Sequence, residues 1–187
     1  MLIGVVGLNG SGKDTIAEFL ADRHGYMHRD LGQEIRNELK RQGRNHQDRN
    51  EMISLGNEMR QKHGFNYWCR NAIESAKSRD IVITSLRNPL EVEEIKNRNG
   101  TVMEVFADQR LRFERTAERM RKNPGSHGDI KSFEVFRTME EKELTSDDPA
   151  KQQLIKCIEM ADVRIDNNGT FEQLYKEVEE ALSQLSK

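Results

Sequence analysis

A glycine-rich stretch between an apolar run and an amphipathic run constrains the fold of this chain more than any other feature. Residues 7–15 read Gly-Leu-Asn-Gly-Ser-Gly-Lys-Asp-Thr, residues 2–6 before them are apolar, and residues 15–20 after them are amphipathic. This order predicts a buried strand, a tight turn and a helix that begins near Lys13. Strands that alternate with helices in this way belong to α/β folds.

The same stretch is suited to hold a polyphosphate. Glycines allow successive main-chain N–H groups to point inward, and the helix N-terminus adds a partial positive charge. The stretch matches the Walker A pattern G-x-x-x-x-G-K-[ST], except that Asp14 replaces the usual hydroxyl residue and the hydroxyl comes one place later, at Thr15. An ordinary tight turn is the alternative, but the flanking strand and helix favour a phosphate-binding loop. The residues expected to bind the nucleotide in this loop are Asn9, Gly10, Ser11, Gly12, Lys13, Asp14 and Thr15.

Length and composition bound the classes of protein that fit. A chain of 187 residues fits one domain, residues 1–187, and its 33% of charged residues predicts long solvated helices. The net charge of −2, with no basic half, disfavours nucleic acid as a partner. We see no signal peptide and no apolar run long enough to cross a bilayer, so we expect a cytoplasmic protein with small-molecule substrates and no membrane partner. No pattern predicts the oligomeric state.

The cysteines and histidines give no sign of a metal site. Cys69 and Cys157 lie far apart and have no C-x-x-C partner, so we expect buried or idle thiols in a reducing cytosol. The histidines lack metal-ligand spacing, and we expect them at the surface or in loops. They are His24, His28, His46, His63 and His127.

Further strands are predicted from short apolar segments at residues 81–83, 101–106 and 163–165, with a weaker candidate at 26–29. Helical patterns lie between them, at residues 90–95, 111–120 and 171–185. This alternation predicts a parallel sheet of about five strands with helices on both faces. Asn167, Asn168 and Gly169 end the last strand, and Thr170 is placed to cap the last helix.

Two long segments interrupt the alternation. Residues 32–78 are nearly all helical in pattern, with a polar turn at 43–47, and residues 122–148 contain a polar turn at 123–129. A plain phosphate-binding ATPase needs neither segment. A small-molecule kinase uses both, since one insertion can hold the acceptor and the other can close over the donor as a lid.

Two arginines and one aspartate follow successive predicted strands. Arg87 comes just after residues 81–83, and Arg36 lies in the helix after residues 26–29. Ligands of open α/β folds bind at the carboxyl ends of the strands, and guanidinium groups bind phosphate well. We therefore expect Arg36 and Arg87 to bind an acceptor phosphate, although each alone would suit a solvated surface. Asp30 is a candidate to orient an acceptor hydroxyl or a metal, and a helix N-cap is an equal alternative.

The order of these segments resembles a known family. The loop at 7–15 and the segments at 31–36 and 84–87 follow the order seen in nucleoside monophosphate kinases. Over essentially its whole length the chain resembles the adenylate kinase-like and dephospho-CoA kinase-like group of P-loop kinases. Residues 112–115 and 161–170 are similar to those of archaeal and bacterial members. The Gly-Lys-Asp-Thr variant resembles phage deoxynucleotide kinases, and adenylate kinases likewise carry their threonine one place late. The resemblance implies a three-layer P-loop NTPase fold.

The resemblance also implies roles for particular side chains. Arg36 and Arg87 would bind the acceptor phosphate, with Arg60 a weaker acceptor-side candidate. Arg115 and Arg119 would face the donor phosphates from the lid, a solvated helix face being the alternative. Asn167 and Asn168 would lie where such kinases pass a loop by the donor base, although capping explains them equally well.

The chain departs from this group where magnesium is usually supported. Thr84 and Ser85 stand where Asp-Gly is common, and Gln33 replaces an acid near the first arginine. Asp14 then becomes the best acidic group near the metal. Because Mg²⁺ keeps several waters, one nearby carboxylate can suffice.

The leading hypothesis is an ATP- and Mg²⁺-dependent kinase for a nucleotide-like acceptor, with a (deoxy)nucleoside monophosphate favoured. Lys13, Arg87 and Asp30 are its candidate catalytic residues. One alternative is dephospho-CoA kinase-like transfer to a hydroxyl, which would need Asp30. Another is a nucleotide-binding regulatory ATPase without a small-molecule acceptor, which the neutral Thr84 favours and the paired arginines and insertions oppose.

Overall fold

The fold is built on a five-stranded, wholly parallel sheet. The computed structural model describes residues 1–77, 79–122, 130, 132–144, 146–148 and 151–185. The strands lie side by side in the order β2-β3-β1-β4-β5, and every neighbouring pair is parallel. Their bounds are β1 (Leu2–Val6), β2 (Met27–Asp30), β3 (Ile81–Thr84), β4 (Thr101–Phe106) and β5 (Val163–Asp166). The predicted parallel sheet of about five strands is therefore confirmed.

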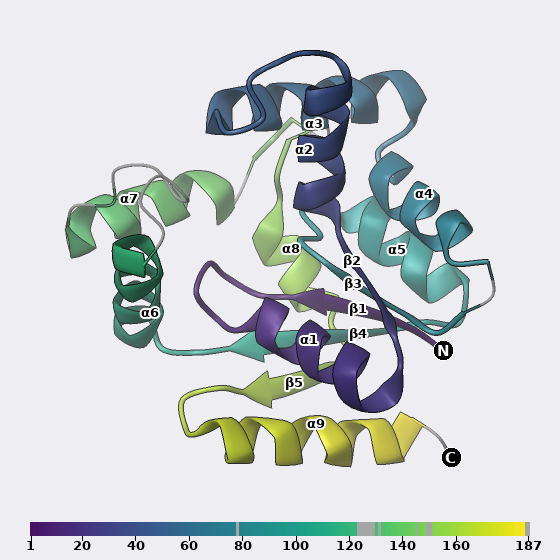
Figure 1. Cartoon of the computed structure of the whole chain (residues 1–187), viewed down its shortest axis with the longest axis vertical. Helices are drawn as coiled ribbons and strands as arrows, with labels where there is room; N and C mark the ends of the chain where they lie inside the picture. The colour runs from purple at the N-terminus through teal and green to yellow at the C-terminus, as the bar shows by residue number, and fades with distance from the viewer. Residues whose placement is uncertain (78, 123–129, 131, 145, 149–150, 186–187) are drawn as a thin grey trace.

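Helices cover both faces of the sheet, which gives the three layers expected (Figure 1). Their bounds are α1 (Lys13–His24), α2 (Leu31–Arg41), α3 (Arg49–His63), α4 (Tyr67–Ser75), α5 (Pro89–Asn97), α6 (Gln109–Lys122), α7 (Phe133–Leu144), α8 (Leu154–Glu159) and α9 (Phe171–Leu185). In the described part of the chain, no helix is long and apolar enough to cross a membrane.

Two hydrophobic clusters hold the layers together. On one face, α1 and α9 pack Ile16 and Val178 against strand residues such as Val5. On the other face, Leu86 and Val92 pack against β1 and β3 together with residues of α2, α3, α4 and α8. Since the central strands β1 and β3 are buried on both faces, their short apolar runs are continuous rather than alternating.

The first long segment is helical, as its pattern indicates. Helices α2, α3 and α4 lie between β2 and β3, and the polar turn at 43–47 separates α2 from α3. Asp48 begins α3 as its N-cap, because its side chain accepts hydrogen bonds from the main-chain N–H groups of Asn50 and Glu51. These helices extend to one side of the sheet (Figure 1).

Helix α7 belongs to the second long segment and lies next to α6, the helix that precedes this segment (Figure 1). Phe113 of α6 contacts Phe133 and Phe136 of α7 edge to face, at ring separations of 5.5 and 5.8 Å. The polar turn predicted at residues 123–129 lies outside the described residues.

One histidine differs from expectation. His28 is a half-buried strand residue of β2, and its Nε2 lies 3.0 Å from Thr84 Oγ1 on β3. A histidine in the short polar strand Met-His-Arg-Asp gives no apolar signal, so its inward position could not be read from the pattern. Cys69 and Cys157 are buried free thiols, as expected.

Candidate nucleotide and acceptor site

The loop between β1 and α1 has the shape its glycines allow. Gly10 and Gly12 have φ values of +79° and +104°, which L-residues rarely adopt. A Cβ on Gly10 would lie 2.5 Å from the Arg112 carbonyl oxygen, and one on Gly12 would lie 2.2 Å from Asn167 Nδ2. Neighbouring segments therefore touch the backbone of the loop, and only glycine fits at these two positions.

Lys13 lies over the loop at the first position of α1. Its Nζ donates a hydrogen bond to the Leu8 carbonyl oxygen at 2.9 Å. Burial, followed by the charge of Arg87, lowers the pKa of Lys13 to about 7. Arg119 acts in the same direction, whereas Asp14 and Asp30 act in the opposite one. Lys13 thus lies at the meeting point of these charged side chains, where an anionic ligand would restore its ammonium form.

Two oxygen-bearing side chains follow Lys13 in the first turn of α1. Asp14 is exposed and Thr15 is half-buried. The described residues contain no cluster of three His, Cys, Asp or Glu side chains suited to hold a metal. Mg²⁺ is commonly bound by one or two protein oxygens together with phosphate oxygens and water, so the donor set at Asp14 and Thr15 fits that ion.

Arg87 lies in the loop between β3 and α5. Its main-chain N–H donates to Glu91 Oε2 at 2.8 Å, and its carbonyl oxygen accepts from the Gln153 N–H at 2.9 Å. Burial is the main cause that lowers the pKa of the Arg87 guanidinium, and the charge of Arg49 follows. The structure therefore brings Arg87 close to both Lys13 and Arg49.

Arg49 is a site residue that the sequence did not reveal. It is the first residue of α3, and burial followed by the charge of Arg36 lowers its pKa. Four cations thus form a row in which the charge of each one lowers the pKa of the one before it, in the order Lys13, Arg87, Arg49 and Arg36. An arginine after a helix N-cap in a polar turn looks like a solvated residue, so no local signal could have identified Arg49.

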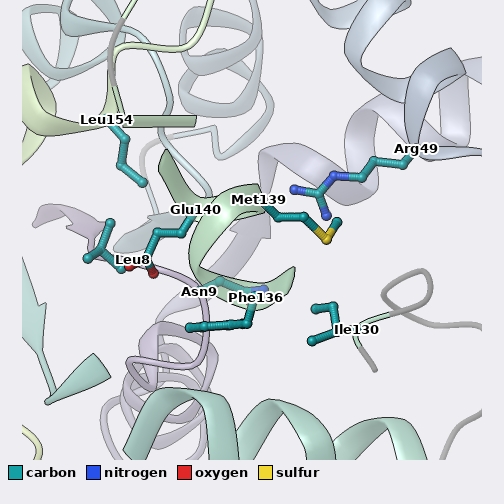
Figure 2. Close-up of a pocket in the computed structure, with 8 residues that line it drawn as sticks. All are labelled: Leu8, Asn9, Arg49, Ile130, Phe136, Met139, Glu140 and Leu154. Carbon is teal, nitrogen blue, oxygen red and sulfur yellow. The ribbon is translucent and has the colours of Figure 1, made fainter. Parts of the chain in front are cut away.

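A hollow lies beside this row of cations. At one part of its wall, the Arg49 side chain extends from α3 toward Met139 of α7 (Figure 2). Leu8 and Asn9 of the loop form another part of its wall. The remaining lining residues are Ile130, Phe136, Glu140 and Leu154. The hollow therefore joins the phosphate-binding loop to both long segments.

Asp30 is placed for two roles at once. As the last residue of β2 it caps α2, because its Oδ1 accepts the Gly32 N–H at 2.9 Å. Its charge also raises the pKa of both Lys13 and Arg87. The N-cap is thus confirmed, and the catalytic role stays a prediction.

The structure does not bring Arg60 together with Arg36 and Arg87 in the cation row. Its side chain is buried, and its Nε and Nη2 donate to Glu91 Oε1 at 3.0 and 2.8 Å. The helical pattern indicated that Arg60 lies in a helix, but it could not predict which side chains the guanidinium would contact.

Two arginines of α6 lie near the phosphate-binding loop. Arg115 Nη2 donates to Asn167 Oδ1 at 3.5 Å, and burial lowers the pKa of Arg115. The charge of Arg119 lowers the pKa of Lys13. Asn167 is buried, and its Nδ2 donates to the Ser11 carbonyl oxygen at 2.7 Å, so the loop after β5 is held against the phosphate-binding loop.

Neither asparagine after β5 caps α9 in the described hydrogen bonds. Asn168 is exposed, its Oδ1 accepts the Asp108 N–H at 2.8 Å, and its Nδ2 donates to Asp166. Thr170 instead exchanges hydrogen bonds with Gln173 at the start of α9.

Comparisons with known proteins agree with this geometry. Residues 3–144 match the family described as AAA domain. The chain belongs to the AAA domain family. Among relatives of this AAA domain protein, a UPF0200 protein of Methanosarcina barkeri is 29% identical over 97% of this chain and 94% of its own length. A UPF0200 protein of Pyrobaculum aerophilum is 28% identical over 98% of each chain.

Solved structures with the same fold include two kinds of small-molecule kinase. A shikimate kinase from Bacteroides thetaiotaomicron superposes on this AAA domain protein with a TM-score of 0.65 at 16% identity, over 100% of this chain and 99% of its own. A gluconokinase from Sinorhizobium meliloti gives a TM-score of 0.54 at 19% identity, over 98% and 91%. The fold is therefore that of P-loop kinases, and the narrower adenylate kinase-like or dephospho-CoA kinase-like group stays a prediction.

Proposed function

We propose that this protein is an ATP- and Mg²⁺-dependent kinase that transfers a phosphoryl group to a nucleotide-like acceptor, with a (deoxy)nucleoside monophosphate favoured. One observation carries the proposal: Lys13 of the phosphate-binding loop and Arg87 of the β3–α5 loop are close enough that their charges repel. Like charges gathered at one sheet edge are typical of a site for anions. Phosphoryl transfer needs such positive charge around the moving group.

The donor half of the site comprises the loop and its helix. The main-chain amides of residues 9–12, Lys13 and the N-terminus of α1 would hold the donor phosphates. Asp14 and Thr15 would hold Mg²⁺, which when bound neutralises charge on the phosphate oxygens. Arg115 and Arg119 lie on this side and would contact the donor.

The acceptor half comprises the other end of the cation row. Arg36, Arg49 and Arg87 would bind the acceptor phosphate as guanidinium groups do. The adjacent hollow has a mixed lining, with Leu8 and Phe136 beside the polar Asn9 and Glu140. A phosphate acceptor is already ionised at neutral pH, so this reaction requires no general base.

Arginine-dependent transfer is the test of this proposal. A coupled assay with Mg·ATP and a panel of (deoxy)nucleoside monophosphates, dephospho-CoA and small sugar acids would show turnover with a monophosphate. Arg87→Ala would lower kcat/KM for that acceptor by about 100-fold, since loss of one preorganised cationic donor commonly has this effect. ATP hydrolysis that no acceptor changes would contradict the proposal and favour the regulatory ATPase.

A hydroxyl acceptor is the second candidate, and the position of Asp30 favours it. Its charge raises the pKa of both Lys13 and Arg87, so its carboxylate lies near both side chains. From there it could take a proton from an acceptor hydroxyl. Asp30→Asn removes the charge but keeps a good N-cap for α2. We expect turnover within about twofold of the original with a monophosphate acceptor. A loss of about 100-fold or more would contradict the monophosphate proposal and support general-base catalysis.

A further inference from the structure

The loop that carries Arg87 has an uncommon backbone conformation. Ser85 has a φ of +63°, a value that favours glycine, in the segment between β3 and α5. Strained backbone persists only where surrounding contacts determine it. The conformation of this loop therefore depends on what its main-chain groups bind.

Glu91 is the main partner of this loop. Its side chain is fully buried, and Oε2 accepts the N–H groups of Arg87 and Asn88 at 2.8 and 3.1 Å. Its other oxygen, Oε1, accepts two hydrogen bonds from Arg60. One buried carboxylate thus joins the Arg87 loop to α3.

The opposite main-chain group of Arg87 is held by a third element. Its carbonyl oxygen accepts the N–H of Gln153, the N-cap residue of α8. The position of the Arg87 backbone is therefore determined by α5, α8 and, through Glu91, α3.

Helix α3 also supplies a member of the cation row. Arg49 stands at its first position and Arg60 in its last turn. The Arg60–Glu91 contact consequently fixes α3 relative to the Arg87 loop, and with it Arg49 relative to Arg87.

A buried ion pair is weak evidence for stability, because apolar residues of similar volume often hold two helices equally well. Apolar residues cannot accept the N–H groups of Arg87 and Asn88, however. The charged pair therefore holds the main chain of the Arg87 loop in a way that apolar packing alone would not provide.

We propose that Arg60 and Glu91 are positioning residues, which act through the Arg87 main chain to set the geometry of acceptor-phosphate binding. This inference rests on the proposed function. It gives Arg60 an indirect role on the acceptor side, from the core and without contact to the substrate.

The test measures donor and acceptor binding separately by titration calorimetry, with Mg·ADP and with the monophosphate that supports turnover. Arg60→Met/Glu91→Met replaces both charges, so neither is left buried alone. We expect this variant to bind Mg·ADP within about twofold of the original protein and the monophosphate at least about tenfold more weakly. The single variant Arg60→Lys, which keeps a cation beside Glu91, should retain most of the acceptor affinity.

Arg98→Met is the matched control, because Arg98 bonds Glu94 at 2.7 Å on the exposed side of the same helix as Glu91. It should change neither affinity. Unchanged monophosphate affinity in the double variant would overturn the inference. Equal weakening of Mg·ADP and monophosphate would also overturn it, since a merely structural role predicts that result. If the original protein binds no monophosphate, the proposed function itself fails, and the inference fails with it.

Discussion

At the scale of single residues, some features of the site are local and others are not. The phosphate-binding loop could be predicted because Gly10 and Gly12 can adopt the positive φ that such a loop requires without steric cost. Arg49 could not be identified, since its role depends on Arg36 and Arg87, which come from other segments. The same holds for Arg60, whose partner Glu91 lies 31 residues away.

The pKa of Lys13 leads to a prediction on proton uptake. With a pKa of about 7 instead of its ordinary 10.5, unliganded Lys13 is mainly neutral at pH 8. Bound phosphates favour the ammonium form, so Mg·ATP binding should take up about one proton at pH 8. Calorimetry in two buffers of different ionisation enthalpy measures this uptake, and Lys13→Met should abolish it. The same uptake in that variant would assign the proton to another group.

The low pKa also determines how Lys13 affects stability. Between pH 7 and 10.5 the unfolded chain binds more protons at this residue than the folded one, so its contribution to the free energy of unfolding rises with pH. Saturation with Mg·ATP should reduce this rise. Thermal melts at pH 7 and 8 would check the sign, because the buried Cys157 thiol, with its pKa raised to about 12, stays neutral there.

At the scale of elements, the order of strands and helices follows from the sequence. Short apolar runs buried on both faces give β1, β3 and β4, and the periodic segment at residues 171–185 gives α9 with the same bounds. What the pattern could not give is how α3 and α7 pack against their neighbouring helices, since side chains from distant segments decide it. The Arg112–Glu140 ion pair is such a contact between α6 and α7.

Arg112 also joins these helices to the phosphate-binding loop. Its Nη1 donates to the Asn9 carbonyl oxygen at 3.2 Å, its Nε donates to that of Ala107 at 2.9 Å, and its ion pair with Glu140 is buried. The Arg112–Glu140 pair holds the phosphate-binding loop without itself contacting the nucleotide. We therefore expect it to support the affinity for the donor.

Glu140→Gln tests that expectation. Loss of its charge leaves the buried Arg112 cation without its carboxylate, which should lower the free energy of unfolding by about 3 kcal/mol and weaken Mg·ATP binding by about tenfold. The neighbouring Glu141 is exposed and pairs with Arg137, so Glu141→Gln should change stability by less than about 0.5 kcal/mol. Denaturant melts and calorimetry would measure both effects. Unchanged Mg·ATP affinity in Glu140→Gln would limit the pair to a structural role.

At the scale of the whole molecule, the distribution of charge matters more than its sum. The chain has a net charge of −2, yet Lys13, Arg36, Arg49 and Arg87 meet at one region beside the carboxyl ends of the strands. Ligands of open α/β folds bind at that edge. The fold brings together cations that are spread over more than seventy residues, and this arrangement underlies the proposed phosphoryl transfer.

The most direct test of this account is titration calorimetry with a bisubstrate analogue, in which two nucleosides are joined through five phosphates. A continuous row of cations from Lys13 to Arg36 predicts one molecule bound per chain, at least about 100-fold more tightly than Mg·ATP. Arg49→Ala and Arg87→Ala should each reduce that advantage while leaving Mg·ATP binding within about twofold. An analogue that binds no more tightly than Mg·ATP would contradict the account.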